Sequence, residues 1–343
     1  MTTLDARAPR DELELDDRLS HPAPSLATLL TSIPGDIIVL GAGGKMGPSL
    51  TRMAKRCDPT RRVIGVSRWT DVMKASALRD AGVEVITADL LDQRSLAALP
   101  DAPNVIFMAG QKFGTTGSPS VTWAMNAALP AFAAERFAGS RTVVFSTGNV
   151  YPLTPVDSAG SVETDALAPV GEYAYSCLAR ERIFTAACER HRSPIAIVRL
   201  NYAHDLRYGA LTDIAVRIAR GDSVDLRMSF VNVIWQGDAN AVALASLACA
   251  SAPTPYVVNV AGPHVLRTRD LAEALGQRLG LMPVFSGEEA SDALLSNSSR
   301  MTELLCDPLL PLETLLDWVA EWIQSAKPLL GKPTGFERRD GRF

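Results

Sequence analysis

The chain has 343 residues and carries 34 lysines and arginines against 38 aspartates and glutamates, which gives a net charge of −4. Hydrophobic residues make up 47% of the chain and charged residues 21%, so the chain can bury a core and whole-chain disorder is excluded. The mild acidic excess and the lack of a basic stripe argue against nucleic acid as the main ligand.

The sequence also bears on the compartment. The N-terminus has no basic segment followed by an apolar stretch, so we expect no secretory signal. The longest apolar run, 239–250, is too short to span a bilayer, which takes about 20 residues. The five cysteines are odd in number and form no C-x-x-C pair, which is typical of free thiols. We therefore expect a cytoplasmic protein with no membrane contact and no metal site.

In chain order, residues 36–145 alternate between short apolar runs and amphipathic stretches. Strands are expected at 37–40, 62–66, 83–86, 104–108 and 142–145. Helices are expected between them at 45–56, 73–80, 93–99 and 123–137. This alternation predicts βαβ units in a doubly wound, Rossmann-type α/β fold with a parallel sheet.

The later half has a different pattern. Helices are expected at 173–191, 211–220, 238–251, 268–279 and 311–325, and strands at 195–200, 231–234 and 256–260. We expect residues 35–200 to form the nucleotide-binding domain with 237–260 returning to it, and 201–236 with 261–330 to form a smaller α+β substrate lobe. Residues 1–34 are interpreted as an extension that packs on the domain or makes an oligomer contact, and 331–343 as a surface tail.

A glycine-rich turn directly follows the first expected strand. Gly41, Gly44 and Gly47 have G-x-x-G-x-x-G spacing, with Lys45 and Met46 in the same turn. Gly41 allows the tight turn, Gly44 lets a pyrophosphate approach the backbone, and Gly47 allows close packing of helix on strand. Because the following helix N-terminus offers free N–H groups, the turn predicts dinucleotide binding; the alternative is a glycine turn without a ligand.

The end of the second strand bears on the choice of cofactor. Ser67 and Arg68 stand where an acidic residue would hold the ribose hydroxyls of NAD. A guanidinium suits a 2′-phosphate, and Lys45 and Arg62 would add positive charge nearby. NADP is therefore favoured over NAD, the alternative being that Arg68 is a solvated loop residue.

Further motifs lie at 145–151 (FSTGNVY), 172–181 (EYAYSCLARE), 198–202 (VRLNY) and 232–241. Together with the glycine turn they resemble the extended short-chain dehydrogenase/reductase family, which includes nucleotide-sugar epimerases and dehydratases. The resemblance runs from residue 36 to about residue 329. It implies an NAD(P)-dependent oxidoreductase, epimerase or dehydratase that acts on a hydroxy or keto group of a sugar-like or other small polar substrate.

The resemblance also implies roles for single residues. Thr147 and Tyr173 take the positions that hold the substrate oxygen, and Asn126 takes that of the family's helix asparagine. Other cofactor contacts are expected at Asp89, Leu90, Ala109 and Leu200, and substrate contacts at Lys112, Tyr151, Asn201, His204 and Arg207. Lys112 and Arg207 would suit an anionic or polyhydroxylated substrate such as a sugar acid. The helix pair at 121–137 and 173–191 implies a homodimer.

One position departs from the family pattern. Four residues after Tyr173, where the family has a lysine that holds the nicotinamide ribose and lowers the tyrosine pKa, this chain has Cys177. Three interpretations follow. Lys112 or Arg180 substitutes for the lysine in an active enzyme; Cys177 or Tyr175 supports different chemistry; or the chain binds nucleotide without turnover, as a sensor or scaffold.

Overall fold

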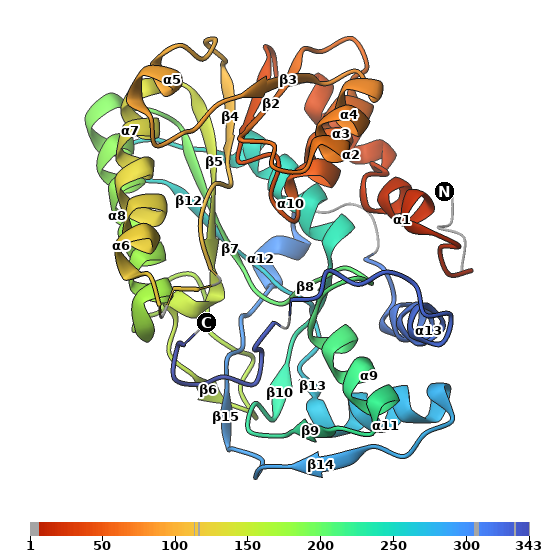
Figure 1. Ribbon diagram of the computed structural model, residues 1–343. Coiled ribbons are helices and arrows are strands. Elements are labelled where there is room, and N and C mark those ends of the chain that lie inside the picture. Colours follow the sequence, from red (N-terminus) through yellow and green to blue (C-terminus); the bar gives the residue numbers. More distant parts are fainter. Residues whose placement is uncertain (1–6, 113, 116, 305–308, 333, 343) are drawn as a thin grey trace.

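The computed structural model describes residues 7–112, 114–115, 117–304, 309–332 and 334–342. Within these residues, a parallel seven-stranded sheet has the order β12-β7-β5-β4-β1-β2-β3 (Figure 1). The strands are β1 (Ile37–Leu40), β2 (Val63–Ser67), β3 (Glu84–Thr87), β4 (Asn104–Phe107), β5 (Arg141–Thr147), β7 (Ile195–Leu200) and β12 (Tyr256–Val260). This order is that of a doubly wound nucleotide-binding sheet, so the expected Rossmann-type α/β class is confirmed.

Two helix layers cover the two faces of the sheet (Figure 1). One layer is α2 (Pro24–Thr31), α3 (Gly47–Cys57), α4 (Val72–Asp80) and α10 (Gln236–Cys249); the other is α5 (Gln93–Ala97), α6 (Pro119–Trp123), η1 (Ala124–Ala128), α7 (Leu129–Arg136) and α8 (Gly171–His191). Ile37 and Val39 of β1 point into the first core, and Ile38 and Leu40 point into the second. Because both faces are buried, the strands read as continuous apolar runs.

A smaller lobe lies beside the carboxyl ends of these strands (Figure 1). Its helices are α9 (Ala210–Arg220), α11 (Thr268–Leu279) and α13 (Leu312–Gln324), packed around a core that contains the fully buried Trp318 and Trp322. Short strand pairs border it: β8 (Ala203–His204) with β11 (Ile234–Trp235), β9 (Ser223–Asp225) with β14 (Val284–Ser286), β10 (Phe230–Val231) with β13 (Leu266–Arg267), and β6 (Thr154–Pro155) with β15 (Asp292–Ala293). The strand expected at 231–234 is thus divided between β10 and β11. Two short helices, η2 (Gly148–Val150) and α12 (Ser299–Thr302), lie after β5 and after β15.

Among the described residues, no helix combines the length and apolar character needed to cross a membrane.

The N-terminal extension packs on both lobes. Its first helix, α1 (Glu12–Leu19), was not predicted, because its sequence is mostly charged and offers only a short apolar stripe. Leu15 and Leu19 on that stripe are fully buried in the core of the smaller lobe. Leu26 and Leu30 of α2 lie instead in the core on one face of the sheet. The extension therefore joins the two lobes.

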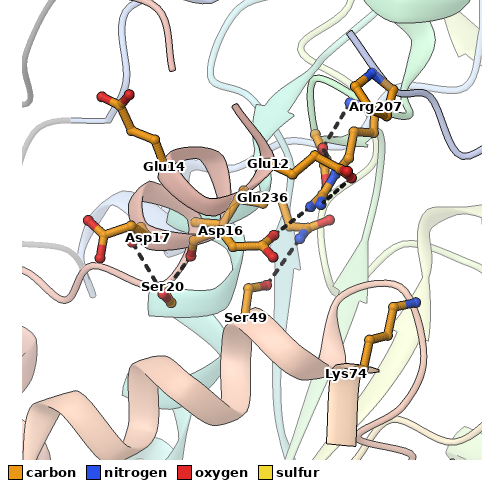
Figure 2. A network of polar contacts seen from close by, with 12 residues as sticks. Glu12, Glu14, Asp16, Asp17, Ser20, Ser49, Lys74, Arg207 and Gln236 are labelled. Atoms are coloured by element: carbon orange, nitrogen blue, oxygen red, sulfur yellow. Dashed lines mark hydrogen bonds and ion pairs between the residues drawn. The ribbon is translucent and has the colours of Figure 1, made fainter. Parts of the chain in front are cut away.

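A polar network fixes α1 to the smaller lobe (Figure 2). The Arg207 guanidinium pairs with Asp205 at 2.9 Å, with Asp16 of α1 at 2.8 Å and with Glu12 at 3.4 Å. The Asp205 side chain is only 1% exposed, and burial opposes its ionisation. Arg207 and Lys45 together outweigh burial and hold the pKa of Asp205 below its usual value. Arg207, expected at the substrate, is therefore occupied by carboxylates of its own chain.

We expect Arg207→Met to lower the free energy of unfolding by about 3–5 kcal/mol, because the buried Asp205 carboxylate loses its partner. Chemical denaturation at pH 7 measures this loss. Arg56→Met is the matched control, since Arg56 pairs with an exposed Asp17 at 2.6 Å and its loss should cost less than about 1 kcal/mol. Equal losses in the two variants would contradict the structural role of Arg207.

Candidate functional site

The glycine turn joins β1 to α3 and leaves an open surface at its centre. Gly41 has a φ of +94°, and an added Cβ would lie 2.6 Å from the backbone nitrogen of Ala109. A Cβ on Gly47 would lie 2.3 Å from the carbonyl oxygen of Ala42. At Gly44 the nearest atom to an added Cβ is the Gly41 oxygen at 3.3 Å. The backbone is therefore closely packed at Gly41 and Gly47 and more open at Gly44. This geometry fits a pyrophosphate seated against Gly44 and the start of α3.

A cavity of about 300 Å³ begins at this turn and extends between the two lobes. It is lined by predicted residues from several distant parts of the chain. They are Gly41, Gly44, Lys45, Met46 and Gly47 of the turn, Lys112 after β4, Thr147 at the end of β5, Tyr173 of α8, and Leu200 and Asn201 at the end of β7 and just after it. A volume of this size is within the range of small-molecule sites.

Thr147 and Tyr173 meet at the centre of the cavity wall. Thr147 ends β5, and Tyr173 lies in the first turn of α8, with its hydroxyl hydrogen-bonded to the side chains of Thr147 and Cys177. Burial raises the pKa of Tyr173 above its usual value of about 10, Cys177 adds to this shift, and Arg180 opposes it. At neutral pH the phenol is therefore protonated and can donate a hydrogen bond to a substrate oxygen.

A buried ion pair joins α8 to β7 next to Thr147 and Tyr173, and a hydrogen bond from Ser146 attaches β5 to it. Glu181 of α8 and Arg199 of β7 lie 2.8 Å apart, with side chains 3% and 6% exposed. The Ser146 hydroxyl, next to Thr147, donates to Glu181 at 2.5 Å. Arg199 also donates to the Tyr151 hydroxyl at 2.6 Å. Tyr151, expected at the substrate, is thus buried as a partner of Arg199 and does not line the cavity.

Cys177 is buried directly beside Tyr173. Its residue is 1% exposed, and burial raises the pKa of its thiol above the usual value. It packs with Val150 and Tyr151 and does not line the cavity. A buried, neutral thiol is a poor nucleophile, so the geometry does not favour chemistry at Cys177.

Two lysines contribute the positive charge of the inner cavity. The Lys112 Nζ lies 5.9 Å from the centre of the Tyr173 ring, and burial lowers the pKa of Lys112 to about 8. The Lys45 Nζ lies 3.9 Å from the centre of the Tyr208 ring, and burial lowers the pKa of Lys45 to about 7. Lys112 therefore brings a basic group to the face of the Tyr173 ring.

Asn126 and Arg180 anchor the loop that carries Lys112. The Asn126 amide accepts from the backbone N–H of Gln111 and donates to its carbonyl, both at 2.8 Å. Arg180 donates to Asn126 at 2.7 Å and to the Phe145 carbonyl at 2.8 Å. Asn126 lies in a π-helical turn that interrupts the single helix expected over 123–137, a feature common at functional sites. Arg180 is thus buried in the support of the loop and does not line the cavity.

His204 and Arg207, both expected at the substrate, do not line the cavity. His204 is fully buried, and within the described part of the chain neither ring nitrogen has a hydrogen-bond partner. Burial lowers the pKa of His204 to about 3, so the ring is neutral. Arg207 is held by its carboxylates.

Five residues expected to contact the cofactor also lie outside the cavity; they are Ser67, Arg68, Asp89, Leu90 and Ala109. Arg68 is exposed. Arg62 lies at the other end of β2, where it pairs with Glu84 at 2.7 Å and Asp36 at 3.3 Å. Lys45 points to Tyr208. Two of the three cations expected to favour a 2′-phosphate are therefore directed elsewhere.

Sequence reasoning missed one wall of the cavity. Thr334, Gly335, Phe336 and Arg338 of the C-terminal segment line it, together with Met228 and Leu294 of the smaller lobe. The expectation of a surface tail is wrong for Thr334 and Phe336, which are 7% and 6% exposed, and Phe336 lies in the core of the smaller lobe. Arg338 is exposed. The one available signal was an aromatic residue placed in an otherwise charged segment.

Residues 37–204 match the sequence model of the family described as "NAD dependent epimerase/dehydratase family". No curated protein matches the chain.

Solved structures share the fold. MoeE5 in complex with UDP-glucose and NAD has a TM-score of 0.67 and 19% identity, with 85% of this chain and 99% of that chain covered. UDP-glucuronic acid 4-epimerase from Bacillus cereus in complex with NAD has a TM-score of 0.68 and 17% identity at the same coverage. The UDP-Glc/GlcNAc 4-epimerase from Campylobacter jejuni has a TM-score of 0.71 and 18% identity, covering 84% of this chain and 99% of its own.

The expectation that NADP is favoured over NAD is wrong. The matching family is described as NAD dependent, and the MoeE5 and Bacillus cereus structures contain NAD. The expectation of an enzyme agrees with the family. Residues 37–204 are thus similar to the NAD dependent epimerase/dehydratase family, the resemblance that the motifs predicted.

Proposed function

We propose that this chain is an NAD-dependent oxidoreductase of the epimerase/dehydratase type, acting on a hydroxy or keto group of a sugar-like polar substrate. The observation that carries the proposal is the position of Lys112, whose Nζ lies 5.9 Å from the Tyr173 ring in the cavity that begins at the glycine turn. The side chains of Lys112, Tyr173 and Thr147 thus line the same cavity as the glycine turn.

The residues of the chain divide the work as follows. Gly44 and the start of α3 would hold the cofactor pyrophosphate, and Leu200 would lie near the nicotinamide. NAD would supply hydride transfer when bound. Thr147 Oγ1 and Tyr173 Oη hold the substrate oxygen. When that oxygen changes from hydroxyl to carbonyl, the phenolate form of Tyr173 takes its proton, and in the reverse direction the phenol returns the proton to the oxygen.

The protonated Tyr173 is prepared for proton donation and is a weak base. Proton uptake at Tyr173 Oη requires the phenolate, and forming a phenolate near neutral pH requires a nearby positive charge that stabilises it. Lys112 supplies that charge from the loop after β4, because α8 offers the neutral Cys177 at the family's lysine position. In this proposal Asn126 and Arg180 are positioning residues, since they hold the backbone next to Lys112.

We expect NADH to bind more tightly than NADPH, because Arg62 and Lys45 are directed away from the adenosine ribose. Fluorescence titration of the purified protein with each cofactor measures both dissociation constants. Tighter binding of NADPH, or binding of neither cofactor, would contradict the proposal.

Lys112→Met should lower kcat roughly 10- to 100-fold. A unit charge about 6 Å from the centre of the Tyr173 ring stabilises a phenolate by roughly 2–3 kcal/mol at an effective dielectric constant near 20. The assay uses the best substrate from a panel of free and nucleotide-linked sugars. Lys74→Met is the matched control, because Lys74 lies on α4 and pairs with Asp71 outside the cavity. The double variant Cys177→Lys/Lys112→Met should recover part of the lost rate, since it moves the charge to the family's position. A Lys112→Met enzyme with wild-type kcat would refute this role.

The pH profile provides an independent test. A lysine is charged below its pKa, so Lys112 loses its charge as pH rises through about 8. We expect kcat to fall above about pH 8 in the wild type, and we expect Lys112→Arg to lack this fall because its guanidinium stays charged. The two profiles are measured with saturating NAD. Identical alkaline limbs would show that another group controls the rate.

A further inference from the structure

The C-terminal segment 334–342 is anchored on the smaller lobe beside the cavity. The Thr334 backbone N–H and hydroxyl donate to the Asp213 carboxylate at 2.7 and 2.6 Å. Two residues later the Phe336 ring enters the core of that lobe. Glu337 pairs with Arg217 of α9 at 2.7 Å. These contacts fix the first half of the segment.

The second half crosses to the helix that carries Tyr173. Arg339 donates to the main-chain oxygen of Asp292 at 2.8 Å and pairs with its carboxylate. Gly341 then packs against the start of α8, where an added Cβ would lie 2.1 Å from the Val170 oxygen. Gly171, at this contact, is two residues from Tyr173. The segment therefore spans from one lobe to the other and closes one side of the cavity.

The charged side chains that line the cavity are all basic. Lys45, Lys112 and Arg338 line it, and none of the described lining residues is an aspartate or glutamate. The neighbouring carboxylates are engaged behind the wall: Asp205 with Arg207, Asp213 with Thr334, and Glu337 with Arg217. A site with three cations and no carboxylate on its surface favours an anionic occupant.

The three cations differ in what they face. Lys45 belongs to the glycine turn, and Lys112 stands beside Tyr173, so both lie on the cofactor side of the cavity. Arg338 comes from the C-terminal segment, and its residue is exposed where it lines the cavity. Its guanidinium donates to the Arg342 carbonyl at 2.5 Å, and no carboxylate of the described chain pairs with it. A planar guanidinium with free donors suits a carboxylate or a phosphate.

We propose that the C-terminal segment is part of the substrate site and that Arg338 binds an acidic group, a carboxylate or a phosphate, on the substrate. This inference rests on the proposed function, because it takes the substrate oxygen to lie at Thr147 and Tyr173. It assigns to Arg338 the role that the sequence favoured for Arg207. The substrate class is then an acidic sugar or a similar acidic polyol.

Binding of matched probes to the NAD-saturated protein, measured by isothermal titration calorimetry, tests the proposal. The probes are D-glucuronate and D-glucose 6-phosphate against D-glucose, and UDP-glucuronate against UDP-glucose. We expect at least one acidic probe to bind about tenfold or more tightly than its neutral counterpart, and Arg338→Gln to remove that preference. Arg338→Lys should keep part of it. A preference for the uronates or for the 6-phosphate identifies the acidic group.

Arg342→Gln is the matched control, because it removes a guanidinium from the same segment without altering the cavity lining. It should bind all probes as the wild type does. Absence of any acidic preference in the wild type, or an equal loss in Arg338→Gln and Arg342→Gln, would overturn the proposal. NADH titration of the same variants separates the two claims. Normal NADH binding without acidic preference refutes the role of Arg338 alone, whereas failure of the wild type to bind NADH refutes the proposed function.

Discussion

The buried ion pair between Glu181 and Arg199 is the contact on which the site depends. It joins α8 to β7, and through Ser146 it holds the end of β5 against the same helix. Thr147 ends β5 and Tyr173 lies on α8, so the contacts of Glu181 with Arg199 and Ser146 bring these two residues together. Charges buried to this degree are stable only when their hydrogen bonds are satisfied. Tyr151 serves that need and is therefore withdrawn from the cavity.

The position of positive charge distinguishes this site from the pattern that its motifs resemble. The family pattern places a lysine on the helix one turn after the tyrosine, and this chain has a buried thiol there. The next cation on the helix, Arg180, points into the packing and supports Asn126. Asn126 in turn holds the loop that carries Lys112. The helix thus contributes to the cavity's charge indirectly, through the loop that it supports.

Both terminal segments take part in joining the lobes. The N-terminal extension inserts Leu15 and Leu19 into the core of the smaller lobe. It inserts Leu30 into the core between the sheet and the helix layer that contains α3 and α10. The C-terminal segment crosses from α9 to the start of α8. Because both crossings border the interface between the lobes, they limit how the cavity can open. The residues that line the cavity run from Gly41 to Arg338, and the family motifs alone do not include the wall formed by the C-terminal segment.

The sequence by itself determined the sheet and the nucleotide turn. Apolar runs such as 37–40 and 195–200 and the spacing of Gly41, Gly44 and Gly47 are local patterns, and hydrophobic period and backbone sterics act locally. The sequence also placed Thr147 and Tyr173 in family positions and marked Cys177 as the departure. What only the tertiary structure decided was which charges face the cavity. Arg207 and Arg338 are both arginines in loop-like, polar stretches, yet one meets Asp205 and Asp16 and the other meets the cavity. The direction of a charged side chain depends on partners distant in sequence, and such pairings leave no periodic trace along the chain.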